Sequence, residues 1–278
     1  MNPHHPTLHP LLLLSDSALP LGSFAFSSGL ESYLAHTKYF SAHLVTDFSS
    51  NGPTHSPSRP VSRGPPKGPT AHQLMQFLKQ SVHNSASTLI PFLLGGWHRP
   101  EMLLELDDAL DAATPCTVAR RASTAQGKAL GVVWSRALRS GCEIPFSDDD
   151  YSSGQDREGG TGQTRDGGVD ALMEIVPQGH LPPLFGAVSR AMGLGEADAA
   201  YVFLLNHVKA VLSAMVRAGV MGPYQSQGVL AGREVGKWIS EAIADDVWAL
   251  VESAGVSIPA MDLWMGRHEL LYSRIFNS

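Results

Sequence analysis

Apolar residues recur at helical spacing over most of this 278-residue chain. The clearest run covers residues 196–219, where they follow the i, i+3, i+4, i+7 rule of an amphipathic helix. Its apolar positions are Tyr201, Leu204, Leu205, Val208, Leu212, Met215 and Val216. The other face carries Ala200, Val202 and Phe203, so we expect this helix to be buried on nearly all sides.

The same spacing predicts helices over residues 73–95, 101–113, 115–138 and 229–251. Pro100 and Pro115 suit a first helical turn, where a missing backbone N–H removes no helical hydrogen bond. Gly127 falls inside the third range, where glycine costs about 1 kcal/mol relative to alanine, so we expect close packing around it. Alternating strand patterns bounded by hairpin turns are missing. The pattern predicts an all-α fold.

Two stretches interrupt this pattern, at residues 49–69 and 147–168. Both are rich in Gly, Pro, Ser and other polar residues, and they contain too few apolar side chains to offset the entropy cost of ordering the chain. We interpret them as disordered surface insertions in a single compact multi-helix domain spanning residues 1–278. Ordered functional lids are the alternative. Residues 1–9, which contain spaced prolines, are expected to form a mobile arm.

Charge and cysteine content narrow the function classes. The net charge is −6 and no basic stripe is present, which argues against a nucleic-acid partner. The sequence contains neither a basic amphipathic helix nor a long apolar span, so membrane binding is not predicted. No Lys or Arg precedes Lys38, so the positively charged start of a secretory signal is missing. A helical path would separate Cys116 and Cys142 by roughly 35–40 Å, too far for a disulfide. Free thiols then favour a reducing, cytoplasmic location.

Motifs of common catalytic sites are incomplete. The pairs Gly127-Lys128 and Gly236-Lys237 lack the Ser or Thr that ends a phosphate-binding loop. No second histidine follows His268-Glu269 at the spacing of a zinc protease. We therefore expect no enzymatic activity, no catalytic residues and no tightly bound cofactor.

Histidines near the start of the chain are weak candidates for metal contact. These are His4, His5 and His9. Neutral imidazole suits nickel and zinc, so transient nickel contact is possible, although a solvated arm has no fixed ligand geometry. A nickel-binding metallochaperone that uses this arm is the alternative function.

The two chain ends carry the most distinctive motifs. Residues 15–24 read Ser-Asp-Ser-Ala-Leu-Pro-Leu-Gly-Ser-Phe, and residues 28–31 read Ser-Gly-Leu-Glu. Pro20 and Gly22 predict a bend, after which Ser27 or Ser28 caps a helix with Glu31 in its first turn. Residues 121–130 read Arg-Ala-Ser-Thr-Ala-Gln-Gly-Lys-Ala-Leu, and residues 267–276 read Arg-His-Glu-Leu-Leu-Tyr-Ser-Arg-Ile-Phe. Together these blocks resemble the UreF family of urease accessory proteins, and the insertions suggest a eukaryotic member.

The resemblance implies a non-enzymatic, all-α, dimeric scaffold. Such a protein binds the accessory protein UreD (also called UreH), and the two recruit the GTPase UreG, so that the assembly handles nickel and inserts it into apo-urease. The resemblance assigns UreD/UreH binding to tail residues Arg267, Glu269, Tyr272 and Arg274, for which helix capping or solvation is the alternative. It places Glu31, Asp107 and Arg217 on the surface, facing UreG or the dimer partner.

Overall fold

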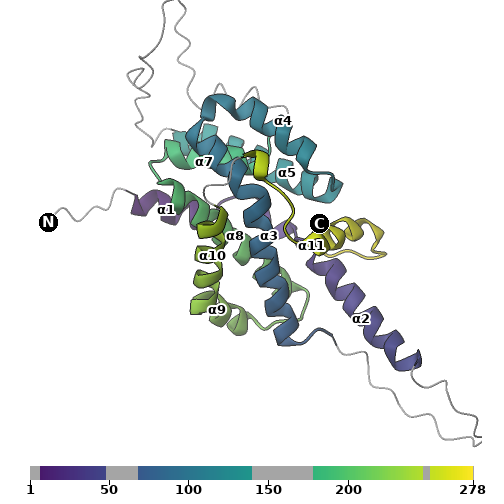
Figure 1. Ribbon diagram of the computed structural model, residues 1–278. Helices are drawn as coiled ribbons and strands as arrows, with labels where there is room; N and C mark the ends of the chain where they lie inside the picture. The colour runs from purple at the N-terminus through teal and green to yellow at the C-terminus, as the bar shows by residue number, and fades with distance from the viewer. Residues whose placement is uncertain (1–6, 48–67, 140–177, 247–250, 278) are drawn as a thin grey trace, which may run out of the picture.

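The computed structural model describes residues 7–47, 68–139, 178–246 and 251–277, and all regular structure within these ranges is helical (Figure 1). The α-helices are α1 (Leu8–Ser15), α2 (Leu30–Asp47), α3 (Ala71–His98), α4 (Leu103–Ala113), α5 (Thr117–Val133), α7 (Leu181–Ala191), α8 (Glu196–Arg217), α9 (Pro223–Ala231), α10 (Arg233–Asp246) and α11 (Pro259–Gly266). Single turns join or extend them: η1 (Ser23–Ala25), η2 (Pro100–Met102), the π-helical η3 (Trp134–Leu138), η6 (Val251–Ser253) and η7 (Arg267–Leu270). The all-α prediction is confirmed.

The helices α3 and α8 form the centre of the core. The helix α3 packs most extensively against α7 and also contacts α10 and α8 (Figure 1). Core side chains with no exposed surface include Leu78, Val82, Ile90, Leu93, Leu204, Val208 and Met215. The helix α8 buries residues on several sides, as its sequence predicts. By length and composition alone it could cross a membrane, but 56% of its most apolar window is buried inside the fold.

Close backbone contacts fix the position of α7. A Cβ atom on Gly186 would lie 1.9 Å from the carbonyl oxygen of Leu93 on α3, so only glycine fits this crossing. A Cβ atom on Gly127 of α5 would lie 2.0 Å from the carbonyl oxygen of Gly179, just before α7. The expectation of close packing around Gly127 is confirmed, and it explains why a helix-weakening residue stands there.

The carboxylate of Asp107 holds the start of α7. Its Oδ2 accepts the backbone N–H groups of Gln178 and Gly179 at 2.9 and 3.1 Å, and its Oδ1 accepts that of His180 at 2.7 Å. Asp107 has no exposed surface, so the expectation that it faces a partner is wrong. It lies one helical turn from Leu103 on the buried face of α4, and its carboxylate satisfies N–H groups that would otherwise be buried without partners.

A second buried network joins α7 to α4 and α5. His180 places its Nδ1 3.0 Å from Ser123 Oγ and its Nε2 3.2 Å from Asp111 Oδ1. Although these three residue types form catalytic triads, Ser123 Oγ already accepts the backbone N–H of Leu181, and His180 is fully buried. The network therefore links α4, α5 and α7, and His180 has a structural role.

The predicted helices over 73–95, 101–113, 115–138 and 196–219 are confirmed to within a few residues. The prediction over 229–251 is wrong at its start, because α9 begins at Pro223 and extended backbone at Gly232 separates it from α10.

Three predictions concern segments at the edge of the described residues. The predicted arm over 1–9 is wrong at its end, because α1 begins at Leu8. Pro10 is tolerated in this first turn, where backbone N–H groups have no helical partners. Residues 1–6 lie outside the description, as do nearly all of the insertion at 49–69 and the whole of that at 147–168.

Replacing Asp107 with alanine tests its internal role. We expect Asp107→Ala to lower the free energy of unfolding by about 3 kcal/mol, because the buried N–H groups of Gly179 and His180, together with that of Gln178, lose their acceptor. The neighbouring Asp108 is exposed, so Asp108→Ala should change it by less than about 0.5 kcal/mol. Urea denaturation followed by circular dichroism measures both. Equal stability of the two variants would contradict the internal role of Asp107.

Candidate partner-binding surface at the joined chain ends

Side chains from α8 hold the N-terminal segment, defined here as residues 14–31. Asn206 donates its Nδ2 hydrogen to the carbonyl oxygen of Leu14 at 2.8 Å, and Lys209 donates to that of Ser15. These contacts satisfy carbonyl groups at the end of α1 that have no helical partner. The chain then turns through Gly22, whose φ of 72° is left-handed, which confirms the predicted bend.

The start of α2 is shaped by its contact with α11. Ser27, rather than Ser28, caps the helix, accepting the backbone N–H of Glu31 on its Oγ at 3.5 Å. Gly29 has a φ of 81°, and a Cβ atom there would lie 2.9 Å from the backbone nitrogen of Met265. A side chain at position 29 would therefore be strained and would push α11 away, which explains glycine in this motif.

The carboxylate of Glu31 binds the C-terminal tail, defined here as residues 271–277. Its Oε1 accepts the backbone N–H of Ile275 at 2.7 Å, and its Oε2 accepts that of Phe276 at 3.2 Å. His268 Nε2 lies 3.0 Å from the same Oε2. Only 11% of the Glu31 side chain is exposed, so the expectation that Glu31 faces a partner is wrong: its carboxylate is turned toward the chain's own tail.

The end of the tail has a second anchor in Phe276. Its side chain is only 4% exposed, and the Arg217 guanidinium lies over its ring at 4.4 Å from the centroid. Asn277 donates its backbone N–H to the carbonyl oxygen of Ala25 at 2.8 Å. Burial of an aromatic side chain contributes roughly 1.5–3 kcal/mol, so Phe276 is a substantial anchor.

An ion-pair network crosses the surface beside the tail. Glu269 pairs with Arg121 of α5 at 2.7 Å and with Arg274 at 2.9 Å. Arg121 also donates to the carbonyl oxygen of Asn277 at 2.8 Å. The Arg121 hydrogen bond, together with the charges of both arginines, lowers the pKa of Glu269, so this carboxylate is ionised at neutral pH. Exposed ion pairs stabilise a fold little, so this network orients the tail while Glu31 and Phe276 anchor it.

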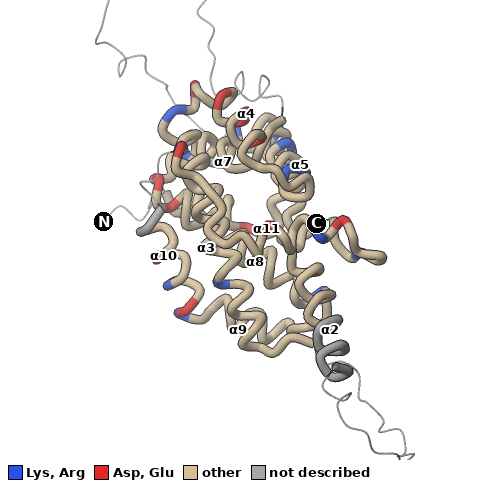
Figure 2. The backbone as a smooth tube through the Cα atoms, turned by 45° about the vertical axis from the view of Figure 1, so that its right-hand side comes forward, with Lys and Arg blue, Asp and Glu red and all other residues tan. Residues whose placement is uncertain are grey.

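Held in this way, the tail and the turn η7 before it leave large side chains in solvent. Tyr272 is fully exposed, and Leu270 and Ile275 are 76% and 66% exposed. These three side chains are named the tail surface below. Arg267 lies exposed beside it. Burial of His36 on α2 lowers the pKa of that histidine, and the positive charge of Arg267 lowers it further. Figure 2 shows basic and acidic positions together around this end of the chain.

The structure brings together most of the residues that the sequence singled out. Arg267, Glu269, Tyr272 and Arg274 lie in or next to the tail, and Arg217 joins them through Phe276. Asp107 lies apart, inside the contact of α4 with the start of α7. Sequence reasoning assigned no role to Arg121 or Phe276. Arg121 opens one of the blocks that resemble the UreF family, but its contact with Glu269 joins positions 148 residues apart.

Metal-ligating side chains do not converge in the part of the chain that the structure describes. No group of three or more His, Cys, Asp or Glu residues there could hold a metal ion. His9 is exposed on α1, whereas His4 and His5 lie outside the described residues. Cys116 is a free thiol, and Cys142 also lies outside the description.

Removing the Glu31 carboxylate should release the tail. Glu31→Ala leaves the N–H groups of Ile275 and Phe276 without their acceptor, so we expect trypsin to cleave after Arg274 about 10-fold faster or more. Glu105→Ala, at an exposed position of α4, is the control and should cleave like the unmodified chain. Limited digestion followed by intact-mass measurement gives the rate. An unchanged cleavage rate in Glu31→Ala would show that the carboxylate does not hold the tail.

Comparisons with known proteins show the family of the chain. A model of the UreF family matches residues 69–233. The "Uncharacterized urease accessory protein UreF-like" of Schizosaccharomyces pombe is 31% identical over 273 residues, covering 97% of each chain. "Urease accessory protein 6" of Cryptococcus neoformans var. grubii is 31% identical over 331 positions, covering 100% of this chain and 99% of that protein. "Urease accessory protein F" of Oryza sativa subsp. indica is 26% identical, covering 95% of this chain and 82% of that protein. The chain therefore belongs to the UreF family.

Proposed function

We propose that this protein is a non-catalytic scaffold in urease maturation. In this role it binds UreD/UreH, and the pair recruits the GTPase UreG for GTP-dependent nickel insertion into apo-urease. Membership of a family whose relatives are named urease accessory proteins supports the general role. The observation that carries the finer proposal is the tail surface, where apolar side chains are exposed on a tail that is held in place.

Exposed apolar side chains on a fixed backbone favour protein binding. Leu270, Tyr272 and Ile275 are all largely exposed within six positions of the chain, and neighbouring exposed apolar side chains commonly mark a protein-binding surface. Because the Glu31 hydrogen bonds and the buried Phe276 ring already order the tail, the tail itself would lose little conformational entropy when a partner binds it. Tyrosine and arginine are also the side chains that most often anchor interfaces.

Each tail residue has a physical role in this proposal. Tyr272 and the side chains beside it supply apolar contact with UreD/UreH. Arg267 and Arg274 supply directional hydrogen bonds at the rim, and Glu269 holds Arg274 in position. Arg217 acts through Phe276, by keeping the tail end against α8.

The scaffold works as a homodimer in the cytoplasm, and nickel is the cargo of the assembly rather than a resident cofactor. The net charge of −6, without a basic stripe, favours protein partners over nucleic acid. Contacts with UreG and apo-urease belong to surfaces other than the tail surface, which UreD/UreH covers.

Co-expression with UreD/UreH and UreG tests the scaffold as a whole. We expect size-exclusion chromatography with light scattering to show a complex that contains two copies of this chain together with both partners. The same run on the chain alone is the reference. A chain that stays monomeric and elutes apart from both partners would contradict the proposal.

A charge placed at Tyr272 tests the tail surface. Tyr272→Asp should leave the fold intact, because the side chain is fully exposed, and should weaken UreD/UreH binding by more than about 2 kcal/mol. Tyr224→Asp is the matched control, since Tyr224 is 93% exposed on α9, away from the tail. Co-purification and calorimetric titration measure the effect. Unchanged binding of Tyr272→Asp would remove the tail surface from the interface.

A further inference from the structure

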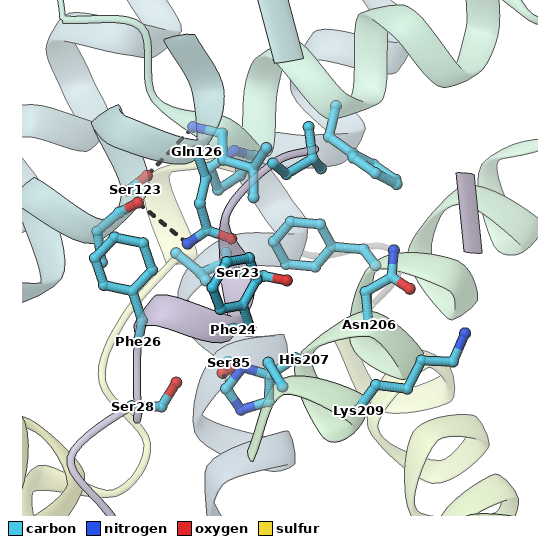
Figure 3. A pocket seen from close by; sticks show the side chains of 18 of the residues that line it. Ser23, Phe24, Phe26, Ser28, Ser85, Ser123, Gln126, Asn206, His207 and Lys209 are labelled. Carbon is cyan, nitrogen blue, oxygen red and sulfur yellow. Dashed lines mark hydrogen bonds between the residues drawn. The ribbon is translucent and has the colours of Figure 1, made fainter. Parts of the chain in front are cut away.

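A pocket of about 240 Å³ lies between the N-terminal segment and helices α5, α7 and α8 (Figure 3). Its apolar wall includes Leu19, Leu21, Phe24, Phe26, Leu89, Ala122, Phe185, Phe203 and Ala210. Phe24 is 62% exposed, an unusual position for an aromatic side chain next to an apolar space. The motif at residues 15–24 therefore forms one wall of a pocket. This role is separate from the contacts that the N-terminal segment makes with the tail.

The charged groups of the pocket already have hydrogen-bond partners within the chain. Among the described residues that line it, Asp16 and Lys209 carry the charges. Lys209 donates to the carbonyl oxygen of Ser15 and lies near the Asp16 carboxylate. Asp16 in turn accepts the backbone N–H of Ala18 at 2.9 Å. Because both charged groups are already engaged by backbone partners, the pocket favours an uncharged ligand.

The histidine on the pocket wall is uncharged at neutral pH. His207 places its Nε2 2.6 Å from Ser81 Oγ and 3.3 Å from Ser85 Oγ. Burial lowers its pKa to about 4. The polar wall that His207 and Ser85 form is therefore neutral under physiological conditions.

One hydrogen-bond acceptor is directed into the pocket. Gln126 donates its Nε2 hydrogen to the backbone carbonyl of Ala122 at 3.1 Å, which fixes the orientation of its amide. Figure 3 shows the oxygen of this amide turned from the α5 backbone toward the pocket. A donor group on a ligand would meet this oxygen.

Size sets the class of molecule that fits. An apolar cavity of about 150 Å³ holds a benzene ring. The space here is larger, at 240 Å³, and has the same predominantly apolar lining. Small-molecule sites commonly combine such a lining with a few directed polar groups.

We propose that this pocket binds an uncharged, mainly apolar molecule of about two fused rings, with one hydrogen-bond donor directed at the Gln126 oxygen. This site is independent of the proposed scaffold function. The ligand contacts the N-terminal segment on one side and α5 and α8 on the other. Because it binds the folded chain, it raises the unfolding temperature.

Titration of the full chain with 2-naphthol at pH 7 tests the site, with 2-naphthoate as the charged probe of the same ring size. We expect saturable 2-naphthol binding, seen by its fluorescence and by calorimetry, and at least tenfold weaker binding of 2-naphthoate. Ala122→Leu fills the pocket and should weaken 2-naphthol binding about tenfold or more. Ala125→Leu, at an exposed position of the same helix, is the matched control and should bind normally.

Phe24→Ala provides a second variant, because an exposed side chain can be removed without unfolding the chain. It should weaken 2-naphthol binding several-fold while leaving the circular dichroism spectrum unchanged. Three results would overturn the proposal: no saturable binding to the unmodified chain, equal binding by Ala122→Leu and Ala125→Leu, or 2-naphthoate binding as tightly as 2-naphthol.

Discussion

The position of the C-terminal tail depends on one carboxylate. Glu31 receives the backbone N–H groups of Ile275 and Phe276, which lie 244 and 245 positions away in the chain, and it also contacts His268. These contacts set the direction of the tail, and the tail direction decides which side chains enter solvent. The pairing of Glu269 with Arg121 and Arg274 then orients the anchored tail, and Tyr272 is left fully exposed. A residue at the start of the chain thereby shapes the surface formed by its end.

A second acidic side chain also accepts backbone hydrogen bonds from a distant segment of the chain. Asp107 gathers three backbone N–H groups before α7, much as Glu31 gathers those of the tail. Both are carboxylates that accept hydrogen bonds from backbone segments distant in sequence, and such bonds are stronger than those between neutral groups. Glu269, by contrast, remains at the surface between arginines.

Helical periodicity in the sequence was sufficient to predict the class of fold and the extent of most long helices. It failed at 229–251, because a repeat of apolar residues continues across the extended backbone at Gly232. The resemblance to a known family singled out the tail residues, and the structure brings them together at one end of the chain, while their role in binding stays a prediction. The roles of Glu31 and Asp107 could not be predicted. The sequence does not show whether the carboxylate of an acidic residue is solvated or accepts hydrogen bonds from a distant backbone segment. Glycine weakens a helix, so the glycine at position 127 inside a predicted helix indicated a close contact there, and the structure contains that contact.

The central claim is that the tail is ordered before any partner binds and then serves as the docking surface. Hydrogen exchange of the chain, alone and bound to UreD/UreH, tests it most directly. We predict that the amides of Ile275 and Phe276 are already protected in the free chain, because both donate to Glu31. Binding should then add protection mainly over residues 267–277. Unprotected tail amides in the free chain, or new protection confined to other helices, would contradict this account.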